Sequence, residues 1–165
     1  MTFELKIFLK DPERIRSMIK HFEPKHAENK TEHYVYFTDK DNRLHVLKDS
    51  NGALSYIVFV NSSPGDTTFT EVPVKSGNRK LTELRKKYTE RMTFTKETTE
   101  YLLRDIKARF CSIAGLGDFL EVQTRDGGKQ RLLEFIDNFD LSEKDTTDKK
   151  YYELMEERKH RRKKS

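Results

Sequence analysis

The segment from Lys107 to Gln123 constrains the fold more than any other part of the sequence, because it predicts a strand, a tight turn and a second strand. Gly115 and Gly117 flank Leu116, and glycine supplies the backbone angles that a sharp turn requires. Side chains two apart in a strand point the same way, so the alternation of residues gives each strand a polar face. The segment therefore predicts an antiparallel hairpin with one charged face.

That charged face has a specific composition. Lys107, Arg109 and Cys111 share one face of the first strand, and Glu121 and Gln123 share one face of the second. Cations beside acidic residues suit a phosphate chain that carries a divalent metal ion. The alternative is an ordinary hairpin whose charged side chains only face water, with Cys111 as a packed thiol.

Length and composition limit the class of protein. With 165 residues, 34% hydrophobic and 37% charged, the chain suits one domain built on a closed sheet with a wet, charged interior. One cysteine excludes an internal disulfide framework and fits a reducing compartment. Because the sequence has neither an apolar run of membrane-spanning length nor a signal-peptide pattern, we expect a cytoplasmic protein with no membrane partner.

The net charge of +5 is concentrated at the C-terminus, where residues 158–165 hold six Lys or Arg and no acid. We interpret this segment as a solvated tail outside a single domain of residues 1–157. Nucleic acid is not expected as a partner except through this tail, and the tail leaves nuclear import open.

Hydrophobic periodicity predicts the remaining elements. Strands are expected at 2–9, 33–38, 43–48, 54–61, 69–74, 91–96 and 100–110, before the second strand of the hairpin. Helices are expected from Asp11-Pro12, over 79–88, after a turn at 126–128, and from Tyr151 onwards. Residues 25–32 and 140–148 are expected to be loop and linker. About eight strands with helices between them predict an α+β fold, a closed or nearly closed antiparallel barrel with helices packed outside.

The hairpin also carries a family resemblance. Gly-Leu-Gly-Asp-Phe-Leu-Glu at 115–121 resembles the hairpin of the CYTH family, which includes class IV adenylyl cyclases and thiamine triphosphatases. Weaker matches follow elsewhere: Glu4 and Lys6 fit the family's opening Glu-x-Glu-x-Lys strand, and Tyr36-Phe37 precedes Arg43 as in its next strands.

The resemblance implies a tunnel of eight antiparallel strands that binds a triphosphate with Mg²⁺ or Mn²⁺. On this basis Glu4 and Glu121 are the expected metal ligands. The expected phosphate contacts are Lys6, Arg43, His45, Lys96, Lys107 and Arg109. The implied partner is a small molecule, a triphosphate or a polyphosphate.

The sequence departs from the family pattern at three expected carboxylates, where Thr2, Cys111 and Gln123 stand instead. A metal ion held by two carboxylates binds weakly, and Cys111 is a poor ligand for a hard cation. We therefore expect a protein that binds the anion with reduced or lost metal-dependent turnover. The alternative is an active metal-dependent triphosphatase or adenylyl cyclase, in which another acid such as Glu71 or Glu100 reaches the site.

Overall fold

The computed structural model describes residues 3–63, 66–125 and 128–164 and contains two compact units. Unit 1 consists of residues 1–30 and 97–165, and unit 2 of residues 31–96. The predicted division into a domain of residues 1–157 and a tail of 158–165 stays a prediction.

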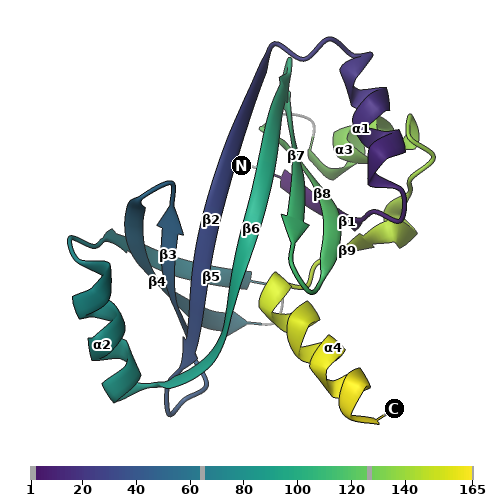
Figure 1. Cartoon of the computed structure of the whole chain (residues 1–165). Helices are drawn as coiled ribbons and strands as arrows, with labels where there is room; N and C mark the ends of the chain where they lie inside the picture. Colours follow the sequence, from purple (N-terminus) through teal and green to yellow (C-terminus); the bar gives the residue numbers. More distant parts are fainter. Residues whose placement is uncertain (1–2, 64–65, 126–127, 165) are drawn as a thin grey trace. The chain divides into compact units, whose positions relative to one another are not determined.

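The described residues form an α+β fold, with helices beside one mostly antiparallel sheet (Figure 1). The helices are α1 (Pro12–Lys20), α2 (Gly77–Lys87), α3 (Gly128–Asp137) and α4 (Tyr151–Lys164), with a 3-10 turn at Glu143–Asp145. The strands are β1 (Phe3–Phe8), β2 (His26–Thr38), β3 (Leu44–Ser50), β4 (Ala53–Ser63), β5 (Asp66–Pro73), β6 (Thr89–Leu103), β7 (Ile106–Ile113), β8 (Gly117–Thr124) and β9 (Thr146–Thr147).

The closed barrel is not confirmed. The hydrogen-bonded order of the strands is β5-β4-β3-β2-β6-β7-β8-β1-β9, and over the described residues its two end strands do not pair with each other. The sheet has nine strands where about eight were expected, because the predicted linker at 140–148 contains β9, which pairs with Lys6 and Ile7 of β1.

Two further boundaries differ from the prediction. Residues 26–32, expected as loop, belong to β2, because a polar segment can form a strand when neighbouring strands satisfy its backbone. The predicted strand 100–110 is broken at Arg104, whose φ of 53° makes the turn between β6 and β7 without glycine or proline. Part of the predicted turn at 126–128 lies outside the described residues, as does Thr2.

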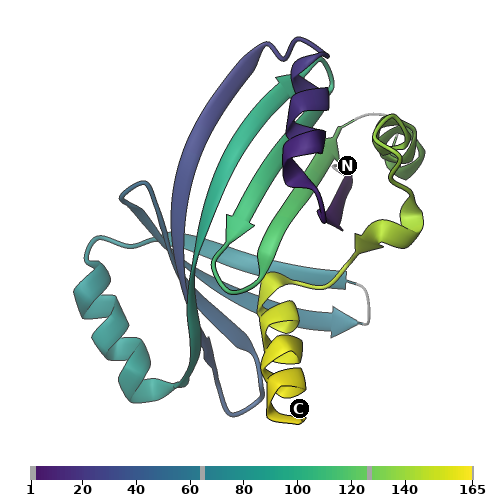
Figure 2. The same cartoon turned by 45° about the vertical axis from the view of Figure 1, so that its right-hand side comes forward.

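Unit 1 has a core between its helices and one face of its strands. Helix α1 begins at Pro12, where the side chain of Asp11 accepts a hydrogen bond from the backbone of Arg14 at 3.3 Å. Ile15 and Ile19, one turn apart on α1, are buried against the strands. Figure 2 shows α1 in front of β7 and β8. The core thus takes up one face of the hairpin and leaves the opposite face for polar side chains.

The hairpin turn is fixed by glycine. Gly117 has a φ of +127°, and a Cβ atom there would lie 2.8 Å from the Phe8 ring. The backbone angle favours glycine at this position, and any other residue would also have to move the half-exposed Phe8 ring. Helix α4 packs beside this turn, with the Met155 methyl group near Gly115 and Arg158 donating a hydrogen bond to the Gly115 carbonyl.

Unit 2 is organised around α2, which covers one face of its strands. Leu84 of α2 is buried with Phe37 of β2 and Leu47 of β3. Ser76 begins the helix by accepting a hydrogen bond from the backbone of Arg79 at 3.4 Å. The β3 side chains with the parity of Leu47 therefore face α2, and those of the opposite parity face away from it.

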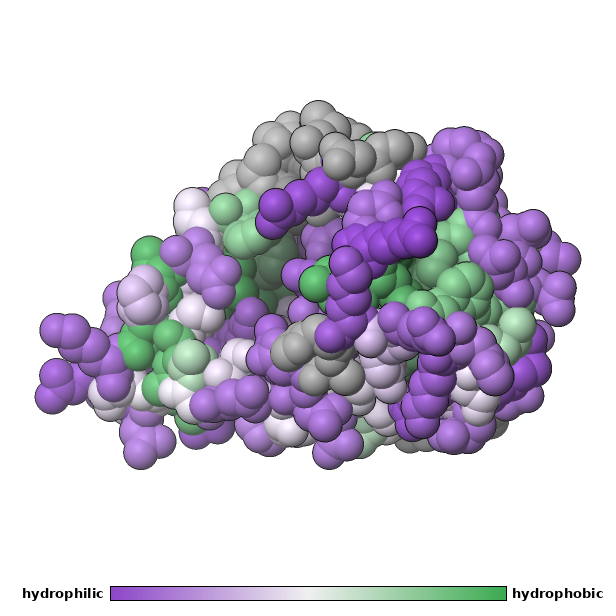
Figure 3. Space-filling model, turned by 90° about the horizontal axis from the view of Figure 1, so that it is seen from above, coloured by the Kyte–Doolittle hydropathy of each residue, from purple (hydrophilic) through white to green (hydrophobic). Residues whose placement is uncertain are grey.

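The surface is rich in charge, as the composition predicts. Figure 3 shows hydrophilic residues over most of the face that it presents. Among the described residues, none of the helices has the length and apolar character needed to cross a membrane.

Candidate anion-binding site

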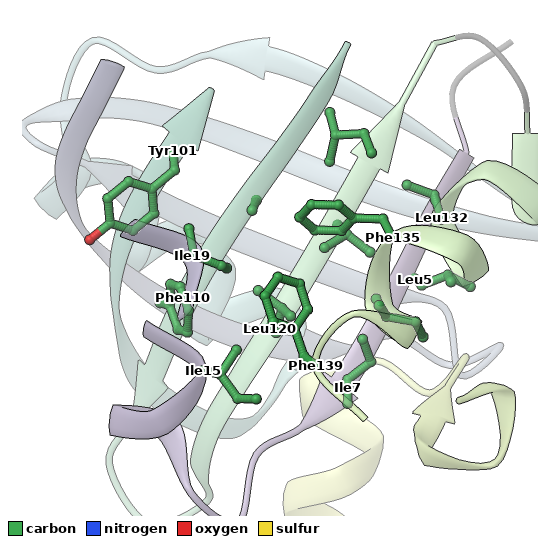
Figure 4. Close-up of a cluster of buried hydrophobic side chains, with 14 of the residues drawn as sticks. Leu5, Ile7, Ile15, Ile19, Tyr101, Phe110, Leu120, Leu132, Phe135 and Phe139 are labelled. Carbon is green, nitrogen blue, oxygen red and sulfur yellow. The ribbon is translucent and has the colours of Figure 1, made fainter. Parts of the chain in front are cut away.

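Three neighbouring strands of unit 1 bring most of the predicted site residues onto one face. In the register of β1, β8 and β7, Lys6 lies opposite Glu121 and Glu121 lies opposite Arg109. The next row contains Glu4, Gln123 and Lys107. Residues of the other parity, such as Leu120 and Val122, enter the core that Figure 4 shows. The predicted parity of the unit 1 residues is therefore confirmed, and we name these six residues with Glu100 the ionic face.

Arg109 is the centre of the ionic face. Its Nε donates to Glu100 at 2.8 Å, its Nη2 donates to Gln123 at 3.4 Å, and its Nη1 lies 3.7 Å from Glu121. Burial opposes the charged form of Arg109, but the hydrogen bond to Glu100 and the negative charges around it raise the pKa of the guanidinium. Arg109 is therefore a permanent cation held by several acceptors.

Glu100 belongs to the site although it was only an alternative in the sequence. Its carboxylate binds Arg109 and lies 3.8 Å from the Lys107 ammonium group. Burial works to raise the pKa of Glu100, yet the hydrogen bond and charge of Arg109, with the charge of Lys107, lower it overall. The alternation of side chains in the predicted strand 100–110 gave the face on which Glu100 lies. Its position beside Arg109 depends on the turn at Arg104, which the sequence does not mark.

Tyr151 is a second residue that the sequence did not assign to the site. From the first turn of α4, its hydroxyl donates a hydrogen bond to Glu121, whose side chain is almost fully buried. Burial, and then the negative charge of Glu121, raise the pKa of Tyr151 far above its ordinary value, so the hydroxyl keeps its proton. The Lys6 ammonium group lies 4.1 Å from the centre of the Tyr151 ring and donates to the Lys149 carbonyl at 2.9 Å. The start of α4 therefore contacts part of the ionic face.

Cys111 stands where the resemblance expects a carboxylate, and it is buried. Its side chain is in unit 1, with 1% of the residue exposed, and the Thr98 hydroxyl donates to its sulfur at 3.7 Å. A buried thiol among hydrogen-bonding neighbours behaves as a packing group, as the alternative interpretation of Cys111 held.

The donor set of unit 1 does not fit a divalent metal ion. Glu121 accepts from Tyr151 through one oxygen and faces Arg109 with the other, while Glu4 is exposed on the adjacent strand. The described residues contain no cluster of three or more His, Cys, Asp or Glu side chains arranged to hold a metal ion. Mg²⁺ and Ca²⁺ need several oxygen ligands, so Glu4 and Glu121 as metal ligands stay a prediction that this arrangement does not favour.

In unit 2, Arg43 and His45 are occupied by local partners. Arg43 lies just before β3, half exposed, with its Nε 3.0 Å from the Asp39 carboxylate. His45 is buried on the face of β3 that α2 covers, where its Nε2 bonds Asp39 at 2.9 Å and its ring stacks on Tyr88. The hydrogen bond from His45 holds the pKa of Asp39 well below its usual range. The role of Arg43 and His45 as phosphate contacts stays a prediction.

Lys96, the third predicted residue of unit 2, belongs to a different cluster. Lys96 and Lys48 lie 3.8 Å and 3.4 Å from the two carboxylate oxygens of Glu32. Lys48 is opposite Tyr34 in the pairing of β3 with β2, and the Tyr34 ring stacks on Phe94 with centroids 4.9 Å apart. The sequence analysis did not identify Lys48 as a site residue or as a neighbour of Lys96.

No family model and no curated protein matches the sequence. Solved structures do match. The PH1012 protein of Pyrococcus horikoshii has a TM-score of 0.78 and 20% identity, over 94% of this chain and 99% of its own. A Vibrio parahaemolyticus protein described as a putative adenylate cyclase has a TM-score of 0.73 and 19% identity, over 94% and 97%.

A third similar structure comes from Hippeastrum and is described as a putative adenylyl cyclase with a dominant triphosphatase activity. Its TM-score is 0.66 at 12% identity, over 95% of this chain and 96% of its own. At these identities the comparison establishes a shared fold. The fold is therefore shared with proteins described as putative adenylyl cyclases, the class of protein that the hairpin resembles.

Proposed function

We propose that the ionic face of unit 1 binds a triphosphate-bearing or polyphosphate anion, with reduced or lost metal-dependent turnover. The observation that supports this most is the placement of Lys6, Lys107 and Arg109 on one face of three adjacent strands. The fold that carries them is shared with proteins described as an adenylate cyclase and a triphosphatase. Ammonium and guanidinium groups bind phosphate oxygens through short charge-assisted hydrogen bonds.

Binding requires an exchange of partners on the ionic face. Arg109 is paired with Glu100 and Glu121, so an incoming phosphate replaces a carboxylate at one of the guanidinium edges. Lys107 is more exposed than Arg109 and lies 3.8 Å from the same Glu100 carboxylate, so it reaches a ligand more readily. Arg109 then orients the anion, since its planar fork fixes direction better than a lysine does.

Feeble turnover is proposed because of the donor set. Hydrolysis of a triphosphate depends on stabilising the charge that develops on the phosphoryl oxygens, which a bound divalent ion usually supplies. The carboxylate at 121 is engaged by Tyr151 and Arg109, and the position opposite Glu4 is the neutral amide Gln123. The anion is therefore held chiefly by protein cations.

The second candidate is an active triphosphatase or adenylyl cyclase that uses Mg²⁺ or Mn²⁺. The observation in its favour is Glu100, a third carboxylate on the ionic face besides Glu4 and Glu121. For this candidate to hold, the three carboxylates would have to rearrange around the ion, because Glu100 and Glu121 are paired with Arg109 and the described residues form no metal-binding cluster.

A phosphate-release assay distinguishes the two candidates. Tripolyphosphate, ATP and thiamine triphosphate are each incubated with Mg²⁺ or Mn²⁺ and the wild-type protein. We expect slow release from the wild type and faster metal-dependent release from Gln123→Glu, because the new carboxylate faces Glu4 across the strand pair. Gln123→Ala is the matched control, since it removes the amide without adding charge. Rapid release by the wild type would overturn the proposal of reduced turnover.

A further inference from the structure

The cluster of Glu32, Lys48 and Lys96 in unit 2 has no role in the proposal above. We infer that unit 2 binds phosphate through Lys48 and Lys96, with Glu32 as an internal counter-ion that the phosphate displaces, and not through Arg43 and His45. This inference deepens the proposed function and rests on it for the class of ligand, a polyphosphate anion.

Burial makes this cluster unusual. The side chains of Glu32 and Lys96 are only 11% and 12% exposed, and that of Lys48 is 26% exposed. Removing ammonium and carboxylate groups from water costs several kcal/mol per ion in typical proteins, so such groups are retained where a pairing or a function requires them. The lysines come from different strands, β3 and β6, and meet at one carboxylate.

The geometry of the three groups suits a phosphate. Each lysine approaches its own oxygen of Glu32, at 3.4 Å for Lys48 and 3.8 Å for Lys96, so one carboxylate bridges two ammonium groups. A phosphate offers more oxygens and more negative charge for the same bridge. The three groups together carry one net positive charge, which attracts a polyanion. When the polyanion replaces the carboxylate, it contacts both ammonium groups.

Aromatic side chains lie beside the cluster and strengthen the attraction between its charged groups and an anion. Tyr36 and Phe94 are nearly fully buried, their rings are stacked with centroids 5.3 Å apart, and Lys96 lies 5.9 Å from the centre of the Tyr34 ring. Burial raises the pKa of Tyr36 well above its ordinary value, so its phenol stays neutral beside Lys96. Poorly hydrated surroundings lower the local dielectric, and charge–charge attraction grows accordingly.

Arg43 and His45 are less suited to the same task. Arg43 faces two carboxylates of its own turn, Asp39 at 3.0 Å and Asp41 at 3.8 Å. Both ring nitrogens of His45 are hydrogen-bonded, one to Asp39 and one to the Tyr56 hydroxyl. The His45 side chain also lies on the face of β3 that α2 covers. A phosphate approaching either residue would meet the negative charge of Asp39 first.

Titration calorimetry of the full chain with tripolyphosphate tests the inference. We expect Lys48→Met and Lys96→Met to weaken binding about tenfold or more, as loss of a charge-assisted bond does. Lys48→Arg, which keeps the charge, should retain most of the affinity. Glu32→Gln should strengthen binding about threefold or more, because the carboxylate no longer competes. Lys87→Gln, on the exposed side of α2, is the control for loss of one positive charge, and Arg43→Gln tests the rival contact.

Circular dichroism checks that each variant folds. The double variant Glu32→Gln with Lys48→Met removes the Glu32 carboxylate together with its Lys48 partner, which avoids an unpaired buried carboxylate. This double variant should bind more weakly than Glu32→Gln alone. If Arg43→Gln weakens binding and Lys48→Met does not, the inference is overturned while the proposed function stands. If neither the wild type nor Glu32→Gln binds, both are rejected. Binding by Glu32→Gln alone would also reject both, because the phosphate would then fail to displace Glu32 in the wild type.

Discussion

The two units of the chain use cations in different ways. In unit 1, Lys6, Lys107 and Arg109 share the ionic face with their acids because the register of a tight hairpin sets their parity. In unit 2, the predicted contacts are divided between two faces of the sheet. His45 of β3 lies on the face that α2 covers, and Lys96 of β6 lies with Lys48 beside Glu32. The sequence therefore predicts the face of a strand residue reliably where a nearby turn sets the register. It does so less reliably where the packing of a helix determines which face is buried.

The exposure of the arginine is the second difference. The Arg109 side chain is 25% exposed and is shared by two largely buried carboxylates, whereas that of Arg43 is 51% exposed and its buried partner Asp39 also bonds His45. Ion pairs of the first kind are costly to break, because one charge is left in a poorly hydrated site, while exposed pairs contribute little.

The largest expected effect follows from that contrast. Arg109→Met should lower the free energy of unfolding by about 3 kcal/mol, because Glu100 and Glu121 lose their shared partner. Arg43→Met should cause a much smaller loss. Urea unfolding of both variants at pH 7 measures the difference. Equal losses would show that the exposure of the arginine does not distinguish the two ion pairs.

The turns of the two units give the next comparison. Gly117→Ala should destabilise by about 2 kcal/mol, since it strains the backbone and its Cβ atom, 2.8 Å from the half-exposed Phe8 ring, makes that ring move. Gly52→Ala, in the β3–β4 turn, has a φ of +93° and open space around it, so we expect about 1 kcal/mol. Thermal melts monitored by circular dichroism test this order. A larger loss of stability for Gly52→Ala would contradict the interpretation that the turn at Gly117 fixes the register of the hairpin.

Acid should weaken the ionic face in a defined direction. The folded state lowers the pKa of Glu100 below its ordinary value of 4.5, against the effect of burial, through Arg109 and Lys107. A lowered pKa stabilises the fold fully above the unfolded value, and this contribution is lost as the pH falls through the folded value. Glu100→Gln should therefore be less stable than wild type at pH 7, and the gap between their melting temperatures should narrow towards pH 3. A gap that is independent of pH would show that Glu100 does not titrate with folding.

The smallest effect is expected from the basic tail. Deleting residues 158–165 removes the contact of Arg158 with the Gly115 carbonyl, which is worth less than about 1 kcal/mol at an exposed site. Deleting only 162–165 keeps that contact and is the control. A fall in melting temperature of more than a few degrees for the longer deletion would show that this end of α4 holds the hairpin turn in place.

Sequence patterns predicted the elements whose signals are local. Asp11-Pro12 begins α1, Gly115 and Gly117 make the hairpin turn, and Tyr151 begins α4. The parity of Lys6, Glu121 and Arg109 followed from alternation alone.

Other features depend on contacts that one sequence does not display. The polar residues 26–32 form a strand because neighbouring strands pair with them, and the turn at Arg104 has no glycine or proline to mark it. Glu100 could be placed beside Arg109 only once that turn was known. The pairing of Lys48 with Glu32 depends on the choice of the face that α2 covers.

Calorimetry of the wild-type protein with tripolyphosphate, in EDTA and in Mg²⁺, shows whether protein cations or a metal ion hold the anion. We expect binding in EDTA of similar strength to binding in Mg²⁺, because Lys and Arg side chains hold the anion. We also expect the affinity to fall as the salt concentration rises, since exposed charges are screened. No binding in EDTA, together with tight binding in Mg²⁺, would show instead that a metal ion holds the anion.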